Sequence, residues 1–398
     1  MRKFYLFTAI LGLFLSACSQ TELEDLSSKT MTRVSSASIS EDEAIDIALN
    51  AIRGLQHTRT SEGAPEIEYV LRNERTRSSA QSDTLAYIIN YPDNGGYALV
   101  ANTNVVEPLM VYSDKGNLDQ EDLVVKETVI KPLEAYLASL PDDLQPLGYG
   151  DYEIVDQIIY SEVTPQCLIT MNQYVAPWNT VVVQNKGEGI PAGCVPMAMT
   201  FVMTHCKKEL IFDGRYYNFD KIIKTIALQQ GTIETGLSPY TYDFAVSQIS
   251  NLLYDLWPYV VTRYSIDATF GDSDKALNKL IELGYQIPVT KFISNDSIED
   301  IKNYLKTGHL IYGNTIGYRE SDKKSYNHAM VYDGYQDRCR LIVNNRPLPL
   351  TTYLHARWGE DEYRDAYYNT RLLDNSLRFS IDGFDSYICK YFPVKIEK

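Results

Sequence analysis

The chain has 398 residues, enough for two ordinary domains, and its 44% hydrophobic and 22% charged residues are the balance of a folded globular protein. Its formal net charge of -15 makes it a poor binder of nucleic acid or of an anionic membrane surface, so we exclude both as partners.

The amino terminus has the pattern of an export signal. Arg2 and Lys3 precede an apolar run, residues 4–15, that is too short to span a bilayer permanently. The Leu-Ser-Ala-Cys that follows resembles a bacterial lipobox, which implies removal of residues 1–17 and lipidation of Cys18. The alternative is an ordinary signal peptide with a chance cysteine. We expect a protein of the bacterial cell envelope, lipid-anchored at the outer membrane or cell surface through a polar tether, with release after maturation left open.

Two types of pattern follow the tether. Ser40 and Glu43 form a capping box ahead of a helix whose apolar residues continue to Leu55. Strands are predicted at 85–91, 97–101 and 108–113, with a turn at 92–96, and a long helix at 120–140. Pro- and Gly-rich sequence then predicts a domain boundary between about 150 and 166.

The remainder changes from helical to β-rich along the chain. Helices are predicted after Cys194 and at 220–227, 240–256, 274–283 and 297–306. Beyond Gly308, short β-rich runs alternate with turn residues. A helical half followed by an antiparallel half predicts an α+β fold.

Five cysteines remain after Cys18, an odd and sparse set for an exported chain: Cys167, Cys194, Cys206, Cys339 and Cys389. This is not a disulfide framework, and at least one thiol should be free. His205 and Cys206 are adjacent and would point in different directions on a helix, so we expect no zinc site.

Cys194 stands out by its position. Gly193 precedes it, Pro196 suits a first helical turn, and apolar residues then repeat at helical spacing. A cysteine at a helix amino terminus favours the thiolate, which is the nucleophile. Its own backbone N–H can also help to hold an oxyanion. A buried cysteine that merely packs is the alternative.

A thiolate needs a base, and the chain has five histidines. His205 lies eleven residues past Cys194 on the same helix, about 16 Å away, which is too far. His328 begins the apolar run HAMVYDGY after a polar stretch, so it can face a cleft while its strand anchors it. A histidine in a surface loop is the alternative.

These motifs together resemble the streptopain family of papain-like bacterial cysteine peptidases. GCVPMAMTFVM is similar to the family's nucleophile helix, and HAMVYDGY to its histidine strand. MNQYVAPWN resembles the segment whose Gln donates to the oxyanion, which implies that role for Gln173. NGGYALVANTNVVEPLMVYSDKGNLD and SEDEAIDIA resemble its propeptide strands and first helix.

In one motif, the segment after the histidine strand, this sequence departs from the family pattern. YLHARWGEDEYRDAYYN resembles the region of the family's Asn-Trp-Gly-Trp-Gly-Gly, with Trp358 and Gly359 as the first Trp-Gly. Arg357 would then stand where the family has the Asn that orients the imidazole, and acidic residues replace the Gly-rich continuation. An alignment without a gap puts Asn344 in that role but loses the tryptophan. We prefer the alignment on Trp358. We expect that loss of the orienting Asn, the third catalytic element, lowers activity rather than abolishes it.

The resemblance therefore implies a hydrolase, a thiol endopeptidase made as a zymogen and needing no metal or cofactor. We expect a signal at 1–17, a tether and inhibitory propeptide domain of α+β type at 18–160, and a papain-like catalytic domain at 161–398. Cys194 and His328 would form the catalytic pair, Gln173 would bind the oxyanion and Trp358 would shield the pair from water. Its partners would be protein or peptide substrates and its own propeptide. The rival is a catalytically silent surface lipoprotein that keeps the fold as a binding module.

Overall fold

The structure is a computed structural model of the chain. It describes residues 38–53, 55, 63–71, 84–121, 125–140, 153–206, 209–234, 239–266, 268–287, 291–292, 298–319, 324–343, 346–347, 350–360, 364–370 and 384–394. The predicted signal peptide, Cys18 and Asn344 lie outside these residues. No helix within these ranges is long and apolar enough to cross a membrane.

The amino-terminal part packs one helix on an antiparallel meander. Helix α1 (Glu41–Arg53) begins at the predicted capping box: the Glu43 N–H donates to Ser40 Oγ at 3.3 Å, and the Ser40 N–H donates to Glu43 Oε2 at 2.9 Å. The buried face of α1 packs on a sheet of β1 (Glu66–Leu71), β2 (Thr84–Asn90), β3 (Tyr97–Ala101) and β4 (Leu109–Ser113). The predicted helix and the three predicted strands are confirmed, whereas β1 was not predicted.

The helix predicted at 120–140 is shorter than expected. A π-helical turn, η3 (Lys126–Ile130), leads into α3 (Lys131–Ala138). Pro132 lies in the first turn of α3 and has no N–H to donate to a preceding turn. The helical stretch is continuous over residues 125–138, and the predicted start differs because residues 120–121 form a turn.

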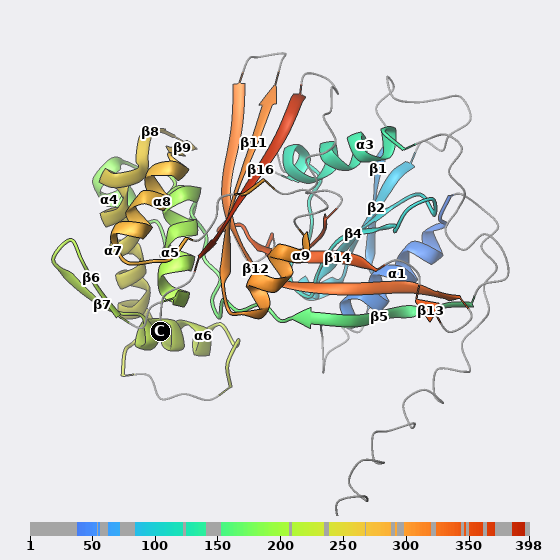
Figure 1. Cartoon of the computed structure of the whole chain (residues 1–398), viewed down its shortest axis with the longest axis horizontal. Helices are drawn as coiled ribbons and strands as arrows, with labels where there is room; N and C mark the ends of the chain where they lie inside the picture. Colours follow the sequence, from blue (N-terminus) through green and yellow to red (C-terminus); the bar gives the residue numbers. More distant parts are fainter. Residues whose placement is uncertain are drawn as a thin grey trace, which may run out of the picture.

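The helical half surrounds one apolar core, on the left of Figure 1. Its helices are α4 (Thr180–Lys186), α5 (Cys194–Cys206), α6 (Phe219–Gln229), α7 (Tyr242–Val260) and α8 (Ser273–Glu282). Two short hairpins complete it, β6 (Glu209–Phe212) with β7 (Arg215–Asn218), and β8 (Val261–Ser265) with β9 (Ala268–Gly271). The four helices predicted after Cys194 and in 220–283 are confirmed. Helix α4 and both hairpins were not predicted.

The β half is one antiparallel sheet that continues into the amino-terminal part. Its strand order is β1-β2-β3-β4-β15-β14-β12-β11-β16-β10, and β5 and β13 pair with β12. The later strands are β10 (Lys291–Phe292), β11 (Leu310–Arg319), β12 (Lys324–Val343), β13 (Arg346–Pro347), β14 (Thr351–Arg357), β15 (Ala366–Asn369) and β16 (Phe384–Val394). Helix α9 (Ile298–Lys306), predicted at 297–306, packs against β11 and β12. The predicted α+β class is confirmed.

The region predicted as a boundary is itself a strand. β5 (Glu153–Val163) runs antiparallel to β12, with Val163 opposite Tyr335 and Ile158 opposite Cys339. Most of β5 belongs to the predicted amino-terminal domain, so that domain meets the catalytic strands twice: β5 pairs with β12, and β4 pairs with β15. Long-range pairing of this kind leaves no local mark in a sequence.

Candidate active site

Cys194 is the first residue of α5, as predicted. Gly193 before it has a φ of +98°, and a Cβ there would lie 2.8 Å from Thr269 Cγ2, so only glycine fits the turn into the helix. Helix α5 packs against β12, the strand of His328. Burial raises the pKa of the Cys194 thiol, and the backbone N–H groups of Ala329, Val195 and Cys194 itself partly offset that rise.

His328 is buried on β12, opposite Thr315 of β11, and is followed directly by Ala329. Its ring lies 4.8 Å from the Trp358 ring, tilted by 33°. Its Nε2 is 3.1 Å from the Trp358 carbonyl oxygen, so that nitrogen carries the proton and donates to the carbonyl. Burial lowers the pKa of His328 to about 4, the carbonyl contact opposes this, and Arg364 adds to it.

Gln173 is tied by its backbone to both sides of the site. Its N–H donates to the Gly359 carbonyl at 2.8 Å, and its own carbonyl accepts from the Ala192 N–H at 2.7 Å. Its side chain is buried, and Nε2 donates to Glu360 Oε1 at 3.0 Å. Gln173 therefore lies between the turn that leads into Cys194 and the segment that follows Trp358.

The Trp358 indole covers the His328 ring and separates it from Tyr368 of β15. This indole is buried and packs between His328 and Tyr368, with the Tyr368 ring 5.7 Å away. The Trp358 backbone N–H donates to Asp365 Oδ1 at 2.9 Å, so both ends of the turn from β14 to β15 are joined. Of the four predicted site residues, Cys194 lies on α5 and His328 on β12. Gln173 lies in the segment before α4, and Trp358 directly follows β14.

Family models match the two parts of the chain separately. Residues 171–368 match the peptidase C10 family, and residues 36–136 match the Spi protease inhibitor. The chain belongs to the peptidase C10 family, the streptopain family. It is therefore a cysteine peptidase made as a zymogen with an inhibitory propeptide.

One solved structure agrees with this C10 peptidase in fold. A fragment of prointerpain A of Prevotella intermedia is 14% identical, with a TM-score of 0.52 over 82% of this chain and 98% of that chain. This likeness confirms the predicted papain-like fold with a preceding propeptide. The active interpain A cysteine protease of the same organism is 15% identical, with a TM-score of 0.37 over 58% of this chain and 95% of that chain. A search of the curated proteins finds no match.

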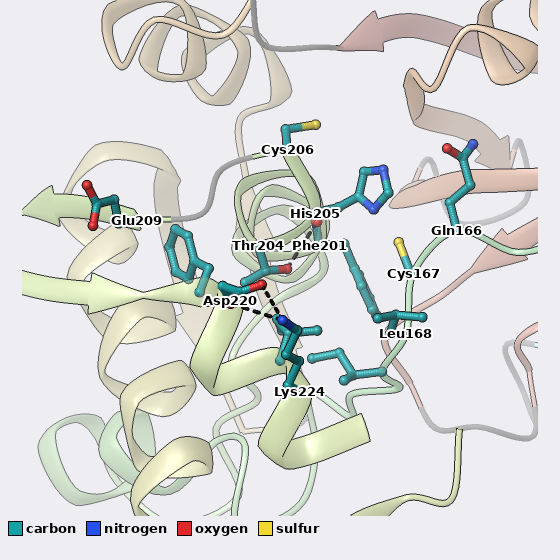
Figure 2. Close-up of a pocket in the computed structure, with 13 residues that line it drawn as sticks. Gln166, Cys167, Leu168, Phe201, Thr204, His205, Cys206, Glu209, Asp220 and Lys224 are labelled. Carbon is teal, nitrogen blue, oxygen red and sulfur yellow. Dashed lines mark hydrogen bonds and ion pairs between the residues drawn. The ribbon is translucent and has the colours of Figure 1, made fainter. Parts of the chain in front are cut away.

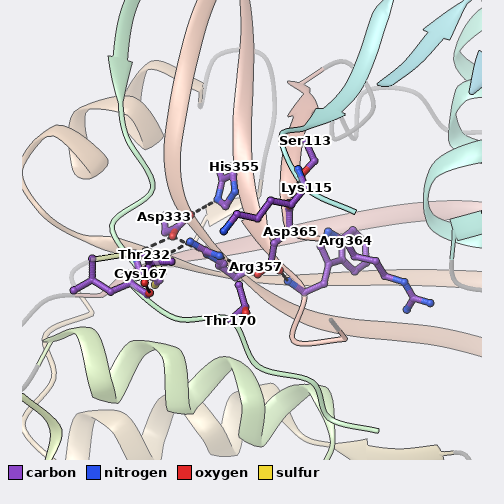
Figure 3. A network of polar contacts seen from close by, with 12 residues as sticks. Ser113, Lys115, Cys167, Thr170, Thr232, Asp333, His355, Arg357, Arg364 and Asp365 are labelled. Atoms are coloured by element: carbon purple, nitrogen blue, oxygen red, sulfur yellow. Dashed lines mark hydrogen bonds and ion pairs between the residues drawn. The ribbon is translucent and has the colours of Figure 1, made fainter. Parts of the chain in front are cut away.

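Arg357 of this peptidase is used in a buried ionic network (Figure 3). Its Nε donates to Asp333 Oδ2 and its Nη1 to Asp365 Oδ2, both at 3.0 Å, and Nη2 donates to the Cys167 carbonyl at 2.7 Å. Asp333 Oδ1 also accepts a hydrogen bond from His355 Nδ1 at 2.6 Å. Burial raises the pKa of Asp333, but Arg357 and His355 outweigh it and hold that pKa well below its usual range.

The network bears on which group orients the His328 ring, the third element of the predicted catalytic site. The guanidinium of Arg357 is committed to Asp333, Asp365 and Cys167, and the contact found on His328 Nε2 is the main-chain carbonyl of Trp358. A main-chain acceptor therefore fixes the ring in this zymogen. Asn344, the rival orienting residue, lies outside the described residues.

The pKa shifts of this zymogen do not favour the predicted thiolate–imidazolium pair, which stays a prediction for the active form. Burial raises the pKa of Cys194 and lowers that of His328, so both groups are neutral near pH 7 in this zymogen. The helix terminus that was expected to favour the thiolate is present, but desolvation outweighs it here. The chain holds a thiol and a neutral imidazole.

The other thiols lie away from Cys194. Cys167, His205 and Cys206 line a cavity of about 690 Å³ at the carboxyl end of α5, about 18 Å along the helix from Cys194 (Figure 2). Burial raises the pKa of Cys167 well above its usual value, which makes that thiol unreactive. Cys167, Cys194, Cys206 and Cys339 form no disulfide, and no group of three or more metal-binding side chains occurs in the part of the chain described.

Two residues of the site were missed by sequence reasoning. Glu360 and Arg364 lie in the turn between β14 and β15, and Glu360 reaches Gln173 and His328. The acidic replacement after Trp358-Gly359 was visible in the sequence as a departure from the family. Its partners were not visible, because they come from segments far away in the chain.

Proposed function

We propose that this C10 peptidase is an endopeptidase that uses Cys194 as nucleophile and His328 as base. One observation supports this most: the sulphur of Cys194 lies at the backbone N–H of Ala329, the residue next to His328. The helix that bears the nucleophile and the strand that bears the base thus meet at their predicted catalytic residues. Such a meeting is required of a nucleophile–base pair.

The chemistry follows from these positions. In the active form His328 takes the thiol proton, and the Cys194 thiolate attacks the peptide carbonyl carbon. The oxyanion is stabilised by Gln173 Nε2 and the Cys194 N–H. The C–N bond breaks as His328 gives its proton to the amine. Water then attacks the thioester, with His328 as base, and restores the thiol, while Trp358 keeps bulk water from the imidazole.

Activation must change the electrostatics of the pair. A thiol with a raised pKa beside an imidazole with a pKa of about 4 has no tendency to transfer its proton at neutral pH. Release of the propeptide, and the solvation and rearrangement that follow, would bring the two pKa values together. The neutral pair is consistent with the latent state of a zymogen.

A silent binding module is the second candidate. The use of Arg357 in a structural network, at the place where the family has an orienting Asn, favours it. The main-chain carbonyl of Trp358 on His328 favours the enzyme, because it supplies a substitute acceptor. Incubation of the full chain separates the two candidates.

The test compares self-cleavage of three full-length chains by mass spectrometry of their fragments. The natural chain and Cys206→Ala should release propeptide fragments, and Cys194→Ala should stay intact, because Cys194 is the described thiol that lies at Ala329, next to His328. Cys206 is a matched control, a half-buried cysteine on the same helix that forms no disulfide. The same fragments from all three chains would contradict the proposed nucleophile.

Export and lipid anchoring at Cys18 are part of the proposal, with the bacterial cell envelope as location. They rest on the short apolar run and on Leu-Ser-Ala-Cys at residues 15–18. We expect Cys18→Ala to move the protein from the membrane fraction to the soluble fraction, because an acidic chain has little affinity for anionic lipid. Membrane association unchanged by this substitution would contradict lipidation at Cys18.

A further inference from the structure

Glu360 places a carboxylate between the proposed base and the proposed oxyanion donor. Its side chain is buried, with 3% of the residue exposed. Oε1 accepts from Gln173 Nε2 at 3.0 Å and from the Tyr174 hydroxyl at 3.2 Å, and it lies 3.6 Å from His328 Nδ1. Oε2 pairs with the Arg364 guanidinium. A peptide carbonyl oxygen would need the same Gln173 donor.

The backbone brings this carboxylate to the site and holds it there. Glu360 forms a β-bridge with Asn172, and the Gln173 N–H donates to the Gly359 carbonyl at 2.8 Å. Gly359 has a φ of +68°, and a Cβ there would lie 2.2 Å from Met197 Cγ on α5. A glycine is therefore needed for this turn to approach the nucleophile helix.

The propeptide reaches the same turn. Strand β4 pairs with β15, with Tyr112 opposite Tyr367 and Val111 opposite Tyr368. The Ser113 hydroxyl donates to the Asp365 carbonyl at 3.1 Å, and the Asp365 side chain accepts from the Trp358 N–H. The two ends of the turn that bears Glu360 are thus joined to each other, and one of them is joined to the propeptide.

We propose that Glu360 is an internal blocking group that fills the oxyanion site of the zymogen as the carboxylate of a cleaved product would. The propeptide keeps it there through β4, and separation of β4 from β15 frees the turn so that Glu360 leaves Gln173. This inference rests on the proposed roles of Cys194, His328 and Gln173. It assigns the block to a residue of the catalytic domain itself.

The test measures labelling of Cys194 in the full-length chain by a peptidyl aldehyde, whose carbonyl oxygen needs the oxyanion site, and by iodoacetamide, which does not. We expect Glu360→Ala to speed the reaction with the aldehyde about tenfold or more, the order expected when one charge-assisted hydrogen bond no longer competes. The iodoacetamide rate should change much less. Glu188→Ala, which removes an exposed carboxylate in the helical half, should behave as the natural chain.

Arg364→Ala provides a second variant that keeps Glu360. Loss of the guanidinium leaves the buried carboxylate without its cation, so Glu360 should move towards solvent and the aldehyde should again react faster. A purely structural ion pair would instead lower thermal stability and leave the ratio of the two labelling rates unchanged.

The outcomes separate this inference from the proposed function. An aldehyde that labels Cys194 equally fast in the natural chain, Glu360→Ala and Arg364→Ala overturns the blocking role and leaves the nucleophile intact. An aldehyde that labels Cys194 in none of them overturns both. Faster labelling confined to Glu360→Ala and Arg364→Ala supports the inference.

Discussion

The two halves of the catalytic domain differ in what completes them. The helical half that bears Cys194 has a core made only of catalytic-domain residues, with α5 packed on α6, α7 and α8 and on β12. The β half that bears His328 shares its sheet with the propeptide, because β15 has β4 as its outer neighbour. The nucleophile is thus held by one domain and the base by two. Control of the enzyme through its propeptide must act on the β half.

Tyr112 makes this difference concrete. It belongs to the propeptide, yet its ring stacks on Tyr367 at 5.2 Å and meets Tyr353 edge-on at 5.2 Å. Its hydroxyl donates to Gln336 Oε1 at 2.6 Å, and the Arg338 guanidinium lies 4.5 Å from the ring centre. No comparable propeptide contact is found on the described helices of the nucleophile half. One side chain therefore joins the propeptide to three strands of the β half.

The largest expected effect comes from removing that side chain. Tyr112→Ala should lower the free energy of unfolding by about 3–5 kcal/mol, as for a fully buried aromatic ring. It should also speed the labelling of Cys194 by a peptidyl aldehyde, because β4 then holds β15 less tightly. Denaturant unfolding and labelling rates measure the two effects.

Tyr69→Ala is the control for Tyr112→Ala. Tyr69 is a propeptide tyrosine on β1 that is 46% exposed and contacts Tyr87 of the propeptide, not the catalytic strands. It should change both quantities little. If Tyr112→Ala destabilises the chain but leaves the labelling rate as it was, the propeptide does not control the site through β15.

Arg357→Asn sharpens the comparison within the β half. The family resemblance alone predicts that restoring Asn at this position raises activity. The network predicts instead a loss of about 3–5 kcal/mol, because Asp333 and Asp365 would lose their cation while buried. Thermal unfolding and peptide hydrolysis, each compared with Arg263→Asn on the exposed hairpin β8–β9, separate these expectations. A more active and equally stable variant would contradict the structural role of Arg357.

Local patterns predicted the parts of the fold that depend on neighbouring residues. The capping box at Ser40 and the apolar spacing after Cys194 located α1 and α5, because helix ends and faces are set within a few turns. The helix predicted at 120–140 was too long, since residues 120–121 form a turn and the helical stretch covers residues 125–138. Strand β5 was not predicted in the boundary region, because its partner β12 is far away in the chain.

The candidate site divides in the same way. Cys194, His328, Gln173 and Trp358 stand in motifs that can be read individually, and their roles stay predictions to be tested. The partners of Arg357 are Asp333, 24 residues away, and Cys167, 190 residues away. The contact of Glu360 with Gln173 spans 187 residues. Such pairs depend on how segments far apart in the chain pack together, which no local pattern contains.

The smallest of the expected effects concerns pH and the buried base. The pKa of His328 falls from 6.5 to about 4 on folding, so the unfolded chain binds more protons than the folded chain between these values. Stability should therefore rise with pH from about 4 to 6.5 and be lowest below pH 4, with about 3 kcal/mol from this residue. Burial under Trp358 is the cause, with the Arg364 charge nearby adding to it and the Trp358 carbonyl opposing it.

His328→Gln tests this origin by removing the titrating group and keeping a hydrogen-bond donor. The slope of unfolding free energy against pH should become shallower, although burial also lowers the pKa of His205, which leaves part of the slope. His309→Gln is the matched control, because His309 is half-buried beside Tyr304 and Thr307, away from Trp358. A slope that is unchanged in His328→Gln would mean that folding does not lower the pKa of the base of the β half. The control exerted by the propeptide would then have to act on the nucleophile instead.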